Sequence, residues 1–293
     1  SGVMSIALLI GGLSVLVLDL GRPDRLIVAM TAYNFKSIFA WNIFFYIGFL
    51  VLVAAYLWVQ MERRLNRFAP ALGLVALIWR LALTTATGSI FGFLVARQAY
   101  DAAVMAPLFI AMSFSFGLAT YILVLLATYR GTGRELGDIL VHRLGRLLGV
   151  FVAAVLYFTA IQHLTNLYAA EHIGVERFIL LDGGIYPLLF WAVQVIAGGL
   201  LPMVLLFRAP KSGKSGTRIA LAALLVIIGG FAQVYVIVIG GQAWPLIFFP
   251  GMEVSSSFYD GVINSYAPSL PELGLGLGGM ALVGLIVVFG LKV

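Results

Sequence analysis

Eight apolar runs of roughly 20 residues fill most of the chain, and they constrain its fold more than any other feature. About 20 residues of α-helix cross a hydrocarbon layer of about 30 Å, so runs of this length predict transmembrane helices. Membrane-spanning strands are excluded, because they alternate apolar and polar residues over about ten positions. The runs extend over Val3–Leu20, Phe39–Gln60, Pro70–Ala96, Ala102–Thr128, Leu147–Tyr168, Ile185–Phe207, Ile219–Gly240 and Pro271–Leu291.

The composition agrees with an all-α integral membrane protein. Apolar residues make up 62% of the chain and charged residues 10%, whereas a soluble domain carries about 25% charge. We expect one transmembrane domain over residues 1–293, with sub-bundles 1–208 and 219–293 as the alternative, divided by the linker-like segment 209–217. Because Ser1 opens directly on an apolar run, we also expect that upstream sequence is missing.

The basic residues predict the orientation of the bundle. Lys and Arg concentrate in cytoplasmic loops of membrane proteins. Twelve of the eighteen lie in loops on one side of the predicted membrane and five on the other, and Arg80 lies inside a helix. We therefore place the twelve-charge side in the cytoplasm. The charges lie in short loops and not on one solvated face, so the basic pI does not indicate nucleic-acid binding.

Polar residues at membrane depth are costly, and their distribution is the main functional signal. They gather in the outer halves of the predicted helices and in the outer loops, while the inner halves hold little beyond Arg80. This bias predicts a polar cavity that opens toward the exoplasmic side. The helical members of this set are Asp19, Asn42, Thr84, Thr85, Thr87, Gln162, His163, Asn166 and Gln233.

Three of the intramembrane ionisable residues have both a structural and a functional interpretation. Asp19 ends the first helix, where Arg22 or Arg25 could pair with it. The pair is either an ion pair that fixes the helix end or a proton-accepting site. Placing Arg80 at mid-bilayer costs about 3 kcal/mol, so its side chain is either clamped by carbonyls or part of a proton path. His163 is either a satisfied packing residue or a ligand contact.

Several cofactor classes are excluded by the residues that the chain lacks. Without cysteine it forms no disulfide, no thiolate-ligated iron–sulfur cluster and no covalent haem. Haem held by two histidines is disfavoured as well, because only His163 is deep in the predicted bundle. We expect no metal site, since no His or carboxylate cluster has ligand spacing.

Three short motifs have structural interpretations. Gly274–Gly279 formally fits a nucleotide-binding pattern, but no strand precedes it, so close helix packing is the better interpretation. Gly88 and Gly92 have the spacing of small residues at a helix–helix contact. Ser269 and Glu272 form a predicted capping box that opens the last helix.

Several short strings together point to one family. The most specific is Asp-Leu-Gly-Arg-Pro at 19–23, and the others are Thr87–Gly92, Ala106–Leu108, Phe190-Trp191 with Pro202, and Ile239–Gln242. These strings resemble the NrfD/PsrC-type membrane subunits of bacterial redox complexes, and the region 240–279 is most similar to the DsrP-type branch of sulfur metabolism.

The resemblance implies a quinone-reactive subunit without redox centres of its own. It implies an iron–sulfur, ferredoxin-like subunit docked on the exoplasmic face, further membrane and redox subunits, and menaquinone or ubiquinone as the cofactor. It places the chain in a bacterial or archaeal cytoplasmic membrane. Longer members have ten helices, so this chain is expected to lack the first two. Where the family commonly has a histidine near the outer end of the third predicted helix, this chain has Thr84, Thr85 and Thr87.

Quinol oxidation releases protons, and this chemistry assigns roles to the polar residues. We expect Asp19 to form the proton route, with Arg22 setting its charge state, and His163 and Tyr157 to bond the head group. Thr84, Thr87 and Gln233 are expected in the cavity wall, and Arg80 on a path to the cytoplasmic side. Two other functions stay open: a secondary transporter and a redox-inactive anchor for partner subunits.

Overall fold

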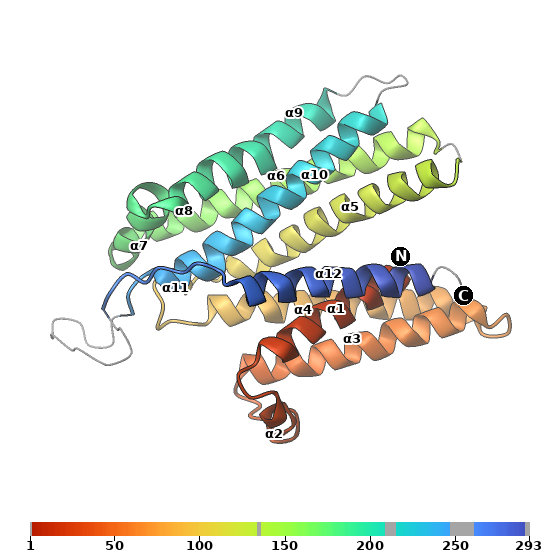
Figure 1. Ribbon diagram of the computed structural model, residues 1–293, viewed down its shortest axis with the longest axis horizontal. Helices are drawn as coiled ribbons and strands as arrows, with labels where there is room; N and C mark the ends of the chain where they lie inside the picture. Colours follow the sequence, from red (N-terminus) through yellow and green to blue (C-terminus); the bar gives the residue numbers. More distant parts are fainter. Residues whose placement is uncertain (1, 134–135, 209–214, 247–260, 291–293) are drawn as a thin grey trace. The chain divides into compact units, whose positions relative to one another are not determined.

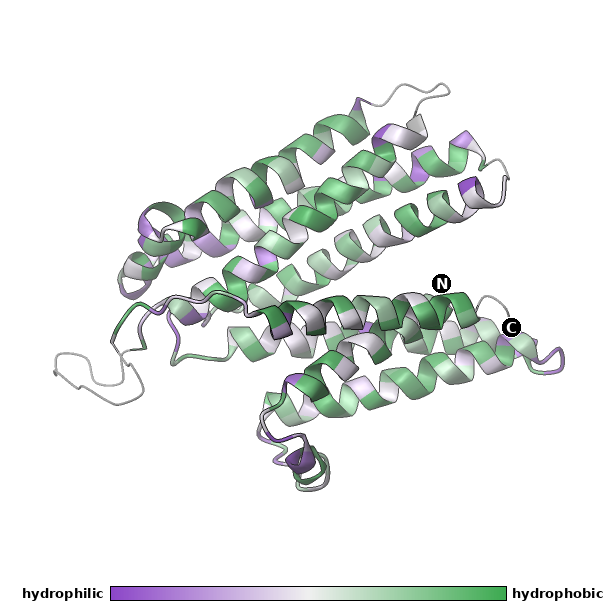
Figure 2. Ribbon diagram, viewed as in Figure 1, coloured by the Kyte–Doolittle hydropathy of each residue, from purple (hydrophilic) through white to green (hydrophobic). Residues whose placement is uncertain are grey.

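The computed structural model describes residues 2–133, 136–208, 215–246 and 261–290, and it is entirely helical apart from turns over these residues (Figure 1). Within these ranges, eight helices are long and apolar enough to cross a membrane. The predicted all-α bundle of about eight transmembrane helices is thus confirmed. Figure 2 shows hydrophobic residues along the long helices and hydrophilic residues concentrated near their ends.

The membrane-length helices match the predicted runs closely, with two exceptions. The fifth begins at Asp138 instead of Leu147, so His142, Arg143 and Arg146 are helical and do not lie in a loop. The third ends at Gly92 instead of Ala96. The spans are α1 (Gly2–Asp19), α3 (Ile38–Met61), α4 (Ala69–Gly92), α5 (Met105–Gly131), α6 (Asp138–Tyr168), a composite helix over Ile185–Phe207, a second composite helix over Gly216–Ala243, and α12 (Leu270–Gly290).

Both composite helices contain π-helical stretches, which are rare and frequently mark functional sites. The first composite consists of α8 (Ile185–Leu188), the π-helical η5 (Leu189–Leu200) and α9 (Leu201–Phe207). The second consists of α10 (Ser215–Tyr235), the π-helical η6 (Val236–Gly240) and α11 (Gly241–Ala243). The short elements are η1 (Pro23–Arg25), α2 (Leu26–Thr31), η2 (Asn66–Phe68), η3 (Ala170–His172), α7 (Ile173–Arg177) and η4 (Phe178–Asp182).

The chain forms two compact units. Unit 1 comprises residues 1–87 and 267–293, and unit 2 comprises residues 88–266. The predicted linker 209–217 lies largely outside the described residues, and the predicted sub-bundles 1–208 and 219–293 stay a prediction.

In unit 1, α1 packs along both α12 and α3. The contact with α12 is made by glycines on both helices, which let the backbones approach. A Cβ at Gly11 would lie 2.4 Å from Val283 Cγ2, and one at Gly279 would lie 2.3 Å from Val15 Cγ2. The predicted glycine packing is therefore right for Gly279 only, because a Cβ at Gly274, Gly276 or Gly278 would meet nothing within 4 Å.

The capping box of α12 is confirmed. The Ser269 backbone N–H donates to Glu272 Oε2 at 2.6 Å, and the Glu272 N–H donates to Ser269 Oγ at 3.5 Å. Two backbone donors at the start of the helix are thus satisfied.

Unit 2 has two apolar clusters stacked along its helices. One lies among the helix ends that carry α7 and α11 and includes Tyr100, Met105 and Phe178. The other lies toward the opposite ends of α5, α6 and α10 and includes Ile122, Leu148 and Ile219. The α10 and η5 backbones touch at one point, where a Cβ on Gly198 would lie 2.4 Å from the Gly229 Cα.

The predicted packing of Gly88 and Gly92 is confirmed within unit 2. A Cβ on Gly88 would lie 2.8 Å from the Ala106 Cα, and one on Gly92 would lie 2.8 Å from the Ala102 carbonyl oxygen. These glycines let the end of α4 approach the start of α5.

The α1–α12 contact predicts opposite effects for two adjacent glycines. Gly11→Ala should lower the melting temperature of the purified protein, because overpacking against Val283 costs about 1–3 kcal/mol. Gly12→Ala should leave it unchanged or raise it, because a Cβ there meets nothing within 4 Å and Ala favours helix by about 1 kcal/mol. Equal melting temperatures for the two variants would contradict the packing.

Candidate functional site

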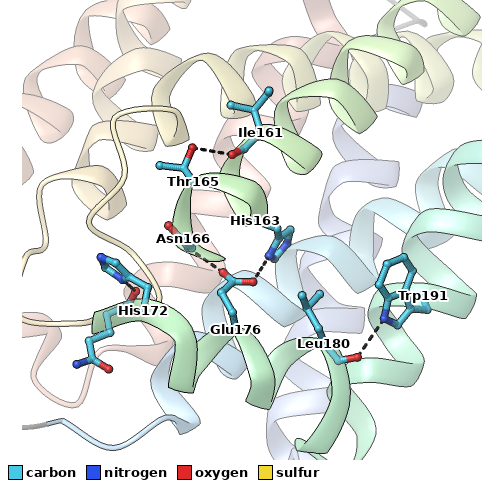
Figure 3. Close-up of polar contacts among 9 residues, drawn as sticks. Ile161, His163, Thr165, Asn166, His172, Glu176, Leu180 and Trp191 are labelled. Atoms are coloured by element: carbon cyan, nitrogen blue, oxygen red, sulfur yellow. Dashed lines mark hydrogen bonds and ion pairs between the residues drawn. The ribbon is translucent and has the colours of Figure 1, made fainter. Parts of the chain in front are cut away.

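A buried carboxylate of unit 2 meets two polar side chains of α6 (Figure 3). Glu176 on α7 is only 1% exposed. Its Oε2 lies 2.6 Å from His163 Nδ1, and its Oε1 accepts a hydrogen bond of 2.8 Å from Asn166 Nδ2. Both carboxylate oxygens therefore have partners from α6, as a buried carboxylate requires.

The spacing of polar residues on α6 creates the other half of this site. Gln162 and His163 lie three and four residues after Thr159, and Asn166 lies four and three residues after them, so the four residues share one helix face. Thr159, Gln162 and Asn166 are buried, and His163 is nearly so. A polar face on a helix that is otherwise apolar turns toward partners within the bundle.

Apolar residues fix the position of Glu176. After α6 ends at Tyr168, the chain reverses through η3 and runs back as α7 and η4. Val175, Phe178 and Ile179 are buried beside Glu176, so hydrophobic burial holds α7 with its carboxylate toward α6. The Trp191 indole N–H donates to the Leu180 carbonyl at 3.0 Å and links η4 to η5.

Two glycines then allow the chain to turn into α8. Gly184 has a φ of +64°, a conformation that favours glycine. A Cβ at Gly183 would lie 2.3 Å from the Phe178 carbonyl oxygen. A side chain at Gly183 would therefore clash with η4, and one at Gly184 would strain the backbone.

His163 has one ring nitrogen fixed by the protein and one available. Nδ1 bonds Glu176, and the ring meets the Phe190 ring edge-to-face at 4.7 Å. Among the described residues, none forms a hydrogen bond with Nε2. A carboxylate on one nitrogen fixes the orientation of the imidazole, so Nε2 can exchange a proton with a ligand.

A second layer of bonds covers the ends of the helices around this site. The buried His172 has its Nδ1 2.6 Å from the Gln98 carbonyl oxygen, and the Trp244 indole donates to Gln98 Oε1 at 3.0 Å. The Arg97 guanidinium donates to the Gln242 carbonyl at 3.2 Å. These bonds tie the segment between α4 and α5 to η3 and α11.

Three predicted site residues lie in unit 2, and each of them bonds or packs against a different partner. His163 is the residue paired with Glu176. Gln233 Nε2 donates to Thr159 Oγ1 at 3.0 Å, one helical turn along α6 from His163. Tyr157 is 62% exposed and packs its ring against Phe158.

The other five predicted residues lie in unit 1. Asp19 and Arg22 are exposed at the end of α1, and the two form no ion pair with each other. The Arg80 guanidinium lies over the Phe49 ring, 5.3 Å from its centroid. The Thr84 hydroxyl donates to the Arg80 carbonyl, and the Thr87 hydroxyl lies within hydrogen-bond distance of Asn42 Oδ1 and the Leu83 carbonyl.

Glu176 and Gln194 are polar residues whose importance the sequence did not indicate. Glu176 lies in the segment between two spans, where a charged residue is ordinary. The available signal was its setting, because the residues from Ile173 to Leu181 are mostly apolar for a loop. In the described part of the chain, no group of three His, Asp or Glu side chains is placed to hold a metal ion.

The comparisons with known proteins identify the family. The family model described as polysulphide reductase, NrfD, matches residues 1–245. The chain belongs to the NrfD family. The predicted resemblance is thereby confirmed, while the DsrP-type branch stays a prediction.

Three relatives align with nearly the whole of this NrfD-family chain. It is 31% identical to the Hdr-like menaquinol oxidoreductase integral membrane subunit of Archaeoglobus fulgidus, over 99% of this chain and 73% of that protein. It is 26% identical to a putative dimethyl sulfoxide reductase membrane subunit of Halobacterium salinarum, over 97% of this chain and 71% of that protein. It is 23% identical to a selenate reductase subunit of Mesobacillus selenatarsenatis, over 95% of this chain and 72% of that protein.

The cellular location follows from the helices and the relatives together. Eight apolar helices and membrane-subunit relatives from archaea and a bacterium make this NrfD-family chain a multi-pass protein of the cytoplasmic (inner) membrane.

The protein is expected to lose stability in alkali because of Tyr100, which lies between α4 and α5. Burial raises the pKa of its hydroxyl above the ordinary value of 10.0, although Arg97 and a hydrogen bond with Gln242 lower it in part. Above about pH 10 the unfolded chain therefore releases a proton that the folded protein retains, and stability falls as pH rises.

Tyr100→Phe should remove this component of the pH dependence. The variant also loses the bond from the hydroxyl to the Val238 carbonyl, which is 3.0 Å long, so we expect lower stability at neutral pH by about 1–3 kcal/mol. Unfolding measured between pH 8 and 11 checks this. A slope above pH 10 as steep as that of the wild type would contradict it.

Proposed function

We propose that this protein is the membrane subunit of a quinone-linked oxidoreductase complex and that it binds quinol or quinone beside His163 and Glu176. Family membership and the menaquinol oxidoreductase subunit among its relatives support the class of complex. The observation that carries the site is the His163 ring, with Nδ1 held by a buried carboxylate and Nε2 available to a ligand.

The residues fit the requirements of a quinone head group. A head group needs polar partners for its ring oxygens beside an apolar environment, and on oxidation the bound quinol supplies two electrons and two protons. His163 Nε2 can bond one oxygen, and the Phe190 ring packed against the imidazole supplies apolar surface. Menaquinone and ubiquinone both satisfy this pattern, and the name of the Archaeoglobus fulgidus relative favours menaquinone.

The pair can accept one of these protons without moving the backbone. Neutral His163 accepts a proton at Nε2 from the bound hydroxyl, while Nδ1–H donates to Glu176 Oε2. The Glu176 carboxylate then stabilises the imidazolium, and Asn166 fixes the other carboxylate oxygen. In the reverse direction the imidazolium donates the proton back at Nε2.

We propose that the electrons pass to another protein. The sequence contains no cysteine, so it provides no thiolate ligands for a cluster of its own. We propose a ferredoxin-like iron–sulfur subunit as the partner, docked on the exoplasmic face near the site. The distribution of basic loops supports this face, because it places the α6–α8 connection opposite the twelve-charge side.

The remaining predicted residues are proposed for supporting roles. Asp19 with Arg22 is proposed as a proton route and Arg80 as a path toward the cytoplasmic side. Tyr157 is proposed to bond the head group, and Thr84, Thr87 and Gln233 are proposed as further quinone-binding residues. These assignments rest on residue type and membrane depth.

Glu176→Gln tests the proposal most selectively, because it preserves the size of the side chain and removes its charge. We expect quinol oxidation by the complex to fall about 10²- to 10⁴-fold, the usual range for a lost acid–base group. His163→Ala should also weaken binding of a quinone analogue. Glu62→Gln is the matched control, because Glu62 is exposed at the end of α3 and lies in unit 1. Asp19→Asn in the same assay tests the proton route.

The results also separate the two alternatives. Unchanged analogue binding and turnover in both Glu176→Gln and His163→Ala would overturn the site and favour a redox-inactive anchor. Uptake of a solute by proteoliposomes that lack redox partners would favour a secondary transporter.

A further inference from the structure

A small cavity with four polar residues in its wall lies inside unit 2, between its two apolar clusters. Its volume is about 20 Å³, and a cavity of about 10–15 Å³ or more can hold one water molecule. Its wall comes from α5, α6, η5 and α10. The polar residues in this wall are Ser115, Thr159, Gln194 and Gln233.

One atom in this wall is buried without a partner. Gln194 is 7% exposed, and its Oε1 is buried with no hydrogen-bond partner among the described residues. Ser115 is 1% exposed, and within the described residues no hydrogen bond involves its hydroxyl. A buried carbonyl left unpaired costs about 1–3 kcal/mol, so native proteins rarely keep one.

We infer that this cavity holds one bound water molecule, which donates to Gln194 Oε1 and bonds the Ser115 hydroxyl. The Thr159 hydroxyl, which accepts from Gln233, lies in the same wall and offers the water a third partner. About three hydrogen bonds are typical for a buried water. The proposal is independent of quinone binding.

Other ligands fit this cavity less well. No carboxylate lines it, so a cation there would be a buried charge without compensation. The volume is too small for a quinone ring or for any other organic head group.

The water would also fill the space that is left beside the close contact of η5 with α10. The π-helical η5 and α10 touch at Gly198 and Gly229, and both glycines line the cavity. The water bridges η5 to α5 beside this contact. It extends the polar face of α6 inward by one turn from His163, through Thr159.

A density map of the purified complex in lipid nanodiscs, at a resolution that shows ordered water, tests the site directly. We expect a peak about 2.7–3.2 Å from Gln194 Oε1 and within hydrogen-bond reach of the Ser115 hydroxyl. An empty cavity, or a Gln194 side chain rotated onto a protein donor, would overturn the proposal.

Melting temperatures give a second test, because a hydrated and a dry cavity predict opposite signs. If the water is present, Gln194→Met and Ser115→Ala each remove one of its bonds and lower the melting temperature. If the cavity is dry, each variant removes an unpaired buried group and leaves the melting temperature equal or higher. Gln233→Met, which loses its bond to Thr159, is the reference for a lost buried hydrogen bond.

The double variant tests whether one water serves both residues. Because a shared water can be lost only once, Gln194→Met with Ser115→Ala should lower the melting temperature by less than the sum of the single shifts. Additive shifts would overturn the shared site even if both single variants are destabilised.

Discussion

The hydrogen-bonded pairing of the Glu176 carboxylate with His163 and Asn166 organises unit 2. Removing one hydrogen-bond partner costs about 1–3 kcal/mol, because a buried polar group is then left unsatisfied. The pairing therefore requires α7 to lie against the end of α6. The chain reversal after Tyr168, the glycines between η4 and α8, and the bonds to Gln98 all keep this geometry.

The same pairing explains why a polar face can exist on a transmembrane helix. Three polar residues of α6 bond partners on other elements. Asn166 and His163 bond Glu176 on α7, and Thr159 bonds Gln233 on α10. Lipid offers no hydrogen bonds, so such a face is stable only inside the bundle. The protein thus holds an ionisable pair at one end of unit 2 and neutral amides and hydroxyls deeper in the same unit.

The sequence predicted the helices well because each span must be long and apolar, and this requirement is local. The capping box at Ser269 and Glu272 was predictable for the same reason. The predicted start of the fifth span was wrong, because basic residues such as Arg143 and Arg146 extend α6 beyond its apolar part. The packing predicted for the glycines of 274–279 was right only for Gly279, since spacing alone does not show which glycines face a neighbour.

The site was predictable only as far as its helical half. Residue type and depth indicated His163, but its partner comes from a segment that folds back after the span, and such a reversal has no local signal. Gln194 was missed because one amide in a long apolar run is unremarkable until its surroundings are known. The roles of all the predicted site residues stay predictions: Asp19, Arg22, Arg80, Thr84, Thr87, Tyr157, His163 and Gln233.

The most direct measurement is a density map of the complex with a tightly bound quinone-site inhibitor. The account predicts a head-group oxygen about 2.7–3.2 Å from His163 Nε2, with Nδ1 still bonded to Glu176. A head group bound elsewhere, with His163 and Glu176 remote from it, would contradict the account.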